Sequence, residues 1–169
     1  MTKANIIFIH GLESTGQGFK AQFFRNIFPG CITPDFKPFN AELSFDILLK
    51  KRMSQLITFL DEEKEWKIIG SSFGGLMGAL YTLKYPNKVE LLILLAPLLA
   101  VTALNPDKFR SIDIPVIIFH GKNDNIVPMK DSRNRAKKLF KNLQFNVVDD
   151  DHMLHSTVTE INWKEIINP

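Results

Sequence analysis

Two serines stand between glycines where a short apolar run ends, in the segment Gly70-Ser71-Ser72-Phe73-Gly74. The segment satisfies the pattern G-x-S-x-G with Ser72 at its centre, and it lies between a strand-like run and a helix-like run. A sharp strand-to-helix turn would present Ser72 as a nucleophile and would require very small residues at Gly70 and Gly74. An ordinary tight turn gives a similar pattern, so the interpretation depends on partner residues elsewhere.

A serine nucleophile needs a base and an acid, which in this kind of site follow it along the chain in the order acid, then histidine. Asp124 comes just after the fifth apolar run, and His152 comes soon after the sixth. Because the carboxyl ends of parallel strands meet at one edge of a sheet, both side chains are expected near Ser72. His155 is the alternative base, and one of the acids in the run Asp149-Asp150-Asp151 could orient the histidine in place of Asp124.

The oxyanion of an acyl-transfer reaction would be held by two backbone amides. One is the amide after the nucleophile, that of Phe73, and the other comes from the loop after the first strand. That loop begins His10-Gly11-Leu12, where His10 would support the loop and Gly11 would permit a turn that aims the Leu12 N–H inward. These residues together predict a serine hydrolase that forms an acyl-enzyme and needs no metal or organic cofactor.

Two other classes of function stay open on the sequence alone. A metal-dependent hydrolase could use the loop from Asp149 to His155, although a solvated acidic turn is the commoner fate of such a run. A catalytically silent binding protein could keep the fold and the geometry of the site. A phosphate or dinucleotide binder is disfavoured, because both the lysine of a phosphate-binding loop and the pattern G-x-G-x-x-G are missing around Gly70.

Short apolar runs alternate with helical patterns, which predicts a three-layer α/β/α domain with a mostly parallel sheet. The six expected strands are 6–10, 31–34, 66–70, 89–95, 115–120 and 145–148. The expected helices are 19–27, 44–63, 73–85, 129–141 and 158–167, the last with a capping box formed by Thr157 and Glu160. No insertion is long enough for a cap domain, so we expect a single domain over residues 1–169.

The composition is that of an ordinary globular protein, with 45% hydrophobic and 23% charged residues. A net charge of +3 with scattered basic residues argues against nucleic acid as a partner. The single cysteine, Cys31, fits a reducing compartment, and no apolar run is long enough for a signal peptide or a membrane span. We therefore expect a cytoplasmic monomer or homodimer that acts on a small molecule and binds no membrane.

Three segments resemble the α/β-hydrolase superfamily, namely HGLESTGQGFKAQFFRNIFPG, GSSFGG and DHMLH. The resemblance covers essentially the whole chain and is to the small, lidless bacterial esterases of the YqiA-like type. It implies a six-stranded sheet in the order 2-1-3-4-5-6 without the two leading strands of larger members. It also implies the same roles for Ser72, Asp124 and His152, with carboxylic esters or thioesters of short acyl groups as substrates. The chain departs from the family pattern before His152, where three aspartates replace the usual glycine-rich approach.

Overall fold

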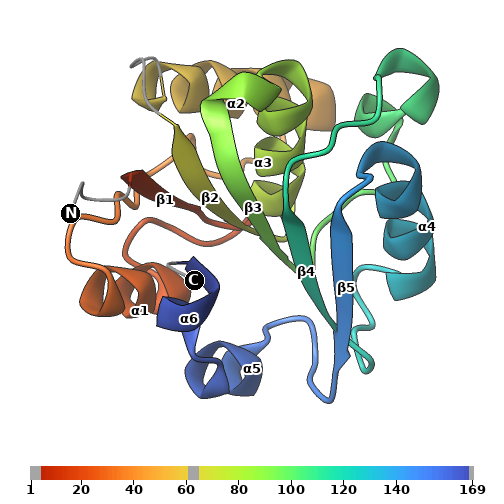
Figure 1. Cartoon of the computed structure of the whole chain (residues 1–169). Coiled ribbons are helices and arrows are strands. Elements are labelled where there is room, and N and C mark those ends of the chain that lie inside the picture. Colours follow the sequence, from red (N-terminus) through yellow and green to blue (C-terminus); the bar gives the residue numbers. More distant parts are fainter. Residues whose placement is uncertain (1–4, 61–64, 168–169) are drawn as a thin grey trace.

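The computed structural model describes residues 5–60 and 65–167, and its centre is a parallel β-sheet. Five strands lie in the order β1-β2-β3-β4-β5, and each neighbouring pair is parallel (Figure 1). Because all of the strands run in one direction, their carboxyl ends share one edge of the sheet. The strands are β1 (Asn5–Ile9), β2 (Trp66–Ser71), β3 (Val89–Leu95), β4 (Val116–Gly121) and β5 (Leu143–Val148).

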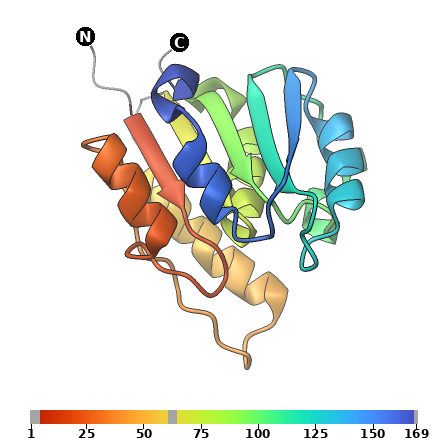
Figure 2. The ribbon, with the colours of Figure 1, turned by 90° about the horizontal axis from the view of Figure 1, so that it is seen from below.

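Helices cover both faces of the sheet, which gives the three layers that the sequence predicts (Figure 2). One face carries α2 (Phe45–Phe59), α3 (Phe73–Lys84) and α4 (Met129–Leu139). The other carries α1 (Phe19–Ile27), α5 (His155–Glu160) and α6 (Trp163–Ile167). Each face has its own cluster of buried apolar side chains, so the central strands are packed on both faces and are mostly apolar.

The strand expected at residues 31–34 does not form, and this is the difference between the five observed strands and the six predicted ones. Ile32 makes a single parallel bridge to Ile7, beside β1 at the place where the resemblance puts a second strand. Its N–H and C=O both bond to β1, at 2.9 Å in each case. The next residue that would donate to this ladder is Pro34, which has no N–H, so the pairing ends after one residue.

The helices follow the predicted positions except at their ends. Helix α2 begins after Ser44, whose hydroxyl accepts the Ile47 N–H, and it ends at Phe59 with Leu60 as its C-cap. Residues 61–63 of the predicted range lie outside the described residues. Helix α4 ends at Leu139 rather than at residue 141, because the chain at the next residue pairs with Ile112 as an isolated bridge.

The prediction of one C-terminal helix over residues 158–167 with a capping box at Thr157 is wrong. Helix α5 begins earlier, at His155, and the chain is extended at Ile161 before α6 starts. Thr157 lies inside α5, and both its amide and its hydroxyl donate to the carboxylate of Asp150. A threonine that is bonded to a distant carboxylate is not free to cap a helix, which explains the earlier start.

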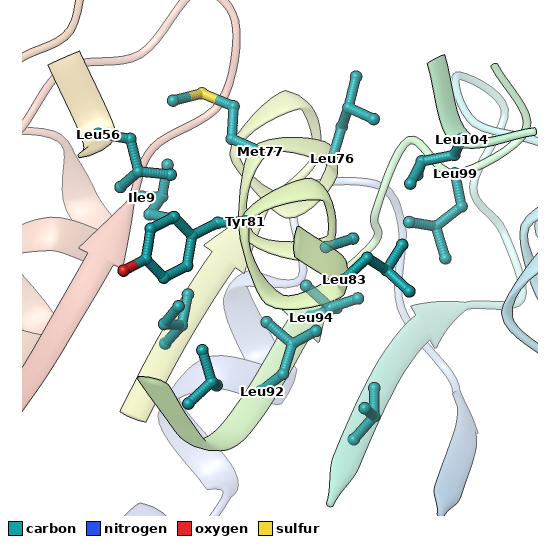
Figure 3. Close-up of a cluster of buried hydrophobic side chains, with 14 of the residues drawn as sticks. Ile9, Leu56, Leu76, Met77, Tyr81, Leu83, Leu92, Leu94, Leu99 and Leu104 are labelled. Carbon is teal, nitrogen blue, oxygen red and sulfur yellow. The ribbon is translucent and has the colours of Figure 1, made fainter. Parts of the chain in front are cut away.

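The larger apolar cluster lies between the sheet and helices α2 and α3 (Figure 3). Leu76 and Met77 of α3 and Leu92 and Leu94 of β3 are completely buried in it. Burial of each such side chain is worth about 1.5–3 kcal/mol, so the start of α3 rests on a strongly packed base. In the described part of the chain, no helix has the length and apolarity that crossing a membrane requires.

Candidate active site

The turn from β2 into α3 places Ser72 in a strained backbone conformation, with φ 53° and ψ −114°. A non-glycine residue in such a region costs about 1–3 kcal/mol and persists only where its surroundings hold it. Here the Ser72 N–H donates to the Leu95 carbonyl at 2.9 Å, and the Ser72 carbonyl accepts the Leu98 N–H at 3.1 Å. Strand β3 and the segment after it therefore hold the elbow from one side.

The two glycines that flank the elbow stand where no side chain fits. A Cβ added to Gly70 would lie 2.5 Å from the Gly74 carbonyl oxygen. One added to Gly74 would lie 2.5 Å from the His10 carbonyl oxygen and closer still to that of Ile9. Glycine at these positions lets α3 approach both its own strand and the end of β1, which brings the loop after β1 beside Ser72.

His152 faces Ser72 across the edge of the sheet. Its Nε2 atom lies 3.1 Å from Ser72 Oγ, and its Nδ1 atom lies 2.7 Å from Asp124 Oδ2. A carboxylate only accepts hydrogen bonds, so Nδ1 carries the proton and the Nε2 lone pair is left toward the serine hydroxyl. The structure thus brings together three residues from the ends of β2, β4 and β5. The alternative histidine, His155, is exposed and packs against Phe19 instead, with ring centroids 4.6 Å apart.

The side chain of Asp124 is fully buried and accepts hydrogen bonds on both oxygens. Oδ1 accepts the N–H groups of Ile126 and Val127, both at 2.9 Å. Burial alone would raise the pKa of Asp124, but these two amides and His152 lower it below its ordinary value. The carboxylate is therefore ionised whenever His152 needs an acceptor at Nδ1.

A second histidine, His120, also contacts Asp124 and was not predicted from the sequence. Its Nε2 atom lies 3.1 Å from Asp124 Oδ2 and 3.1 Å from the Val127 carbonyl oxygen. Both neighbours are acceptors, so Nε2 carries the proton, while Nδ1 is buried and has no hydrogen-bond partner among the described residues. Burial lowers the pKa of His120, so the ring is neutral. Its place just before Gly121 at a strand end, like that of His10 before Gly11, was the available signal.

The acidic run before His152 shapes its loop and does not contact the histidine ring. Asp149 pairs with Lys122 at 3.0 Å, and Asp151 accepts the Met153 N–H at 2.8 Å. Burial alone would raise the pKa of Asp150, but the amide and hydroxyl of Thr157 lower it. Within residues 5–60 and 65–167, no three His, Cys, Asp or Glu side chains are grouped so that they could hold a metal ion.

The loop after β1 is fastened by two buried side chains. His10 Nε2 accepts the Phe36 N–H at 3.1 Å, so its Nδ1 carries the proton and donates to the Gly11 carbonyl at 2.8 Å. Arg52 of α2, which sequence reasoning missed, donates to the carbonyls of Gly11 and Leu12. Its position gave no signal, because it lies within an ordinary amphipathic helix.

The turn after β1, which Gly11 was expected to permit, does not require a glycine. Its φ lies outside the left-handed region, and a Cβ added there would meet the Ser71 carbonyl oxygen and Ser72 Cβ at 3.6 Å, which is ordinary contact. The same distance shows that Gly11 lies directly beside the side chain of Ser72. The Gly11–Leu12 peptide is therefore adjacent to the atoms that would react.

Comparisons with known proteins agree with this architecture. The sequence profile described as "Alpha/beta hydrolase family" matches residues 39–156. No curated protein sequence matches the chain significantly. Among solved structures, a hydrolase of the alpha/beta superfamily from Xanthomonas campestris pv. campestris is similar, with a TM-score of 0.77, 24% identity and coverage of 94% of this chain and 92% of that one.

Two further solved structures are similar over nearly all of this chain. Mouse alpha/beta hydrolase domain-containing protein 10 has a TM-score of 0.75 and 20% identity, and the match covers 97% of this chain and 89% of that one. An alpha-beta serine hydrolase homologue from Coxiella burnetii has a TM-score of 0.72 and 16% identity, with 99% and 84% covered. At these identities the structural matches establish the fold, and the profile match establishes the family.

Proposed function

This chain belongs to the alpha/beta hydrolase family, and from that premise we propose that it is a serine hydrolase of small carboxylic esters or thioesters. Ser72 is the nucleophile, His152 the base and Asp124 the acid that orients it. The observation that carries the proposal is the unbroken chain of contacts, 3.1 Å from Ser72 Oγ to His152 Nε2 and 2.7 Å from His152 Nδ1 to Asp124 Oδ2. Hydrogen bonds of this reach are what proton transfer from a nucleophile to a base requires.

The reaction proceeds in two halves. His152 Nε2 takes the Ser72 proton while Oγ forms a bond to the acyl carbon, and the same proton then passes to the departing alcohol or thiol as its bond to carbon breaks. In the second half His152 takes a proton from water, whose oxygen attacks the acyl-enzyme. The proton returns to Ser72 Oγ as the acid product leaves. Asp124 stays ionised throughout and stabilises the imidazolium that forms on His152.

The oxyanion of each tetrahedral intermediate is held by the amides of Leu12 and Phe73. Phe73 directly follows the nucleophile at the first position of α3, where the positive end of the helix dipole favours negative charge. Leu12 belongs to the peptide beside the Ser72 side chain. Amides placed in this way are typically worth about a hundred- to a thousandfold in rate each.

Three exposed apolar side chains adjoin the residues of the site and support an acyl or alkyl substrate. Met153 follows His152 and is 47% exposed, and Ile126, whose amide bonds to Asp124, is 66% exposed. Phe45, 40% exposed, packs edge-on against Phe73 with ring centroids 5.5 Å apart. Large apolar side chains that stay exposed around polar reacting groups are typical of a surface that binds an apolar ligand.

The test is hydrolysis of p-nitrophenyl esters and acyl thioesters of increasing chain length by the wild type, Ser72→Ala and the matched control Ser71→Ala. We expect Ser72→Ala to lower kcat by at least about a thousandfold, because residual catalysis would come from the oxyanion site alone. Ser71→Ala changes the neighbouring serine, which is buried and, among the described residues, makes no contact with His152 or Asp124 that would serve the reaction, and it is expected to keep most of the activity.

Covalent labelling separates the alternatives. A fluorophosphonate probe is expected to add one adduct to the wild type and to Ser71→Ala, and none to Ser72→Ala. Activity that survives in Ser72→Ala would refute the nucleophile assignment, and a wild type that neither reacts nor hydrolyses would identify a catalytically silent binding protein. Activity that is abolished by a chelator would instead favour a metal-dependent hydrolase.

A further inference from the structure

Arg52 is an arginine in the middle of α2 whose side chain is completely buried. Arginine is rarely buried unless a carboxylate neutralises it. Within the described residues, no Asp or Glu forms an ion pair with Arg52. Backbone carbonyls surround the guanidinium instead. The charge is therefore buried without a counter-ion in the described part of the chain, and its role has to be sought in the backbone groups that it binds.

The guanidinium donates to three carbonyl groups. Nε donates to Lys37 O at 2.8 Å, Nη2 to Leu12 O at 2.8 Å and Nη1 to Gly11 O at 3.2 Å. The same group lies over the Phe73 ring, 5.2 Å from its centroid. One side chain therefore contacts both residues whose amides the proposed function assigns to the oxyanion.

The contact with Gly11 reaches the reacting atoms through a single peptide unit. The Gly11 carbonyl and the Leu12 N–H are the two ends of that unit, and the carbonyl accepts from both His10 Nδ1 and Arg52 Nη1. Hydrogen bonds to a carbonyl polarise the whole peptide, which makes its N–H a stronger donor. A charged donor has a larger effect than a neutral one.

We propose that Arg52 is a positioning residue of the oxyanion site, which orients and polarises the Gly11–Leu12 peptide so that the Leu12 N–H stabilises the oxyanion. This inference rests on the proposed function, because the oxyanion forms only if Ser72 attacks an acyl carbon. The positive charge of Arg52 also stabilises the oxyanion, as the hydrogen bond to Gly11 does. It lies in a dry environment next to Phe73, where its interaction with a developing negative charge is weakly screened.

The test uses the variants Arg52→Met and Arg52→Lys of the full chain. Methionine keeps an apolar stem of similar length, and lysine keeps the charge but has no fork to reach three carbonyls. Arg135→Met is the matched control. The Arg135 guanidinium also donates to two backbone carbonyls, those of Val101 and Leu104, but on the segment after β3.

Two readouts distinguish this role from a structural one. The first is the kinetics of hydrolysis of a p-nitrophenyl ester, with kcat and KM measured separately. The second is the hemiketal that a short-chain alkyl trifluoromethyl ketone forms with Ser72, whose ionisation is followed by ¹⁹F NMR as a function of pH. The hemiketal oxygen occupies the oxyanion site, so its pKa reports directly on the strength of the donors there.

Weakening one donor without removing it should cost less than the full loss of an oxyanion donor. We expect Arg52→Met to lower kcat by about ten- to a hundredfold with KM within about threefold, and to raise the hemiketal pKa by about one to two units. Arg52→Lys is expected to fall between Arg52→Met and the wild type. Arg135→Met is expected to lower the melting temperature and leave the hemiketal pKa unchanged.

The inference is overturned if both Arg52 variants have the same hemiketal pKa and the same kcat as the wild type. It is equally overturned if the variants lose only stability, with the hemiketal pKa unchanged. If Arg52→Met does not fold, Arg52→Lys is judged by the same two readouts. An active Ser72→Ala variant, or a wild type that forms no hemiketal, would refute the proposed function itself. In that case the role of Arg52 is refuted together with it.

Discussion

The sequences at the carboxyl ends of β1 and β4 are similar: Phe8-Ile9-His10-Gly11 runs just past β1, and Ile118-Phe119-His120-Gly121 closes β4. Both histidines are buried, with 1% and 0% of their surface exposed, and both have a lowered pKa because burial disfavours the charged ring. The similar local sequences therefore place both histidines in the same way. Each strand delivers a neutral imidazole to the edge of the sheet, next to the loop that carries part of the site.

The two rings differ in what surrounds them. His10 lies between backbone groups, accepting from the Phe36 N–H and donating from Nδ1 to the Gly11 carbonyl. His120 faces acceptors only at Nε2, including the carboxylate of Asp124, so it holds the opposite tautomer. His10 therefore holds the Gly11–Leu12 peptide in place, and His120 helps to hold the carboxylate of Asp124 in place. Neighbours from distant parts of the chain determine the tautomer, and the strand sequence does not.

The glycines that follow the histidines differ as well, and this difference gives the largest expected effect. A Cβ on Gly121 would lie 2.5 Å from the Asp151 carbonyl oxygen and closer still to that of Asp150. Gly121→Ala must therefore displace the loop that carries His152, and a displacement of about 1 Å in a catalytic group costs roughly a hundredfold in rate. We expect a loss of that size in kcat/KM for an activated ester.

Gly11→Ala is the matched variant for this prediction. Its added methyl group would make ordinary contacts at 3.6 Å, so we expect a loss of only a few-fold, caused by the methyl group beside Ser72. Circular dichroism and thermal unfolding show whether each variant is folded. Equal losses in the two variants would contradict the difference in packing between the two strand ends.

Features that depend on neighbouring residues were predictable from the sequence, and features that depend on distant ones were not. The apolar strands and the glycine-flanked serine predicted the sheet, its helical layers and the proximity of Ser72, Asp124 and His152, whose roles stay predictions. The strand at residues 31–34 failed because Pro34 lacks an N–H at the position where the ladder would continue. That requirement becomes visible only when the pairing register with β1 is known.

The two supporting side chains that the sequence did not reveal illustrate the same limit. Arg52 acts through carbonyls about forty positions away in the chain, and nothing in α2 indicates them. His120 is only four positions from Asp124, but an isolated histidine at a strand end is usually a core residue. The aspartates before His152 depart from the family pattern, and two of them, Asp150 and Asp151, accept the amides that hold the loop of His152.

Replacing each histidine ring tests whether His10 holds a peptide and His120 holds a carboxylate. Phenylalanine suits both sites, because His10 packs against Phe36 and His120 against Phe145. His10→Phe leaves the buried Phe36 N–H without its acceptor, which costs about 1–3 kcal/mol of the free energy of unfolding. His120→Phe leaves acceptors without a donor, but it also removes the buried, unpaired Nδ1, so we expect a loss of about 1 kcal/mol or less.

Loss of the His120 ring is also expected to affect catalysis, through its contact with Asp124. His120→Phe removes one of the donors to Asp124, whose other oxygen keeps both amides, so kcat should fall by up to about tenfold. Urea unfolding and ester hydrolysis measure the two effects on the same preparations. The comparison fails if His120→Phe proves the more destabilising variant while kcat stays unchanged.

The stability of the fold is also expected to depend on pH. Both histidines have a folded-state pKa below the ordinary value of 6.5, so below that pH the unfolded chain binds protons that the folded chain does not. The free energy of unfolding should therefore fall as the pH drops below about 6.5, by at most about 1.4 kcal/mol per pH unit for each histidine. The lowered pKa of Asp124 acts only below its ordinary 3.8, and burial lowers the pKa of Lys20 to about 8, which acts only at higher pH. Urea unfolding between about pH 5 and 6.5 therefore reports mainly on the histidines.

The surroundings of the two rings also predict which one dominates this slope. Burial lowers both pKa values, and a bond to a backbone carbonyl, that of Gly11 or of Val127, raises each of them. The nearby charges differ: the pKa of His10 is lowered by Arg52 and raised by Asp35, whereas that of His120 is raised by Asp124, with which it is in direct contact. His10 should therefore resist protonation to a lower pH and contribute the longer part of the decline. We expect His10→Phe to flatten the curve at pH 5 to 6 more than His120→Phe does. If His120→Phe flattens the curve of unfolding free energy against pH more than His10→Phe does, the carboxylate of Asp124 does not offset the effect of burial on the pKa of His120. The two strand ends would then be electrostatically alike.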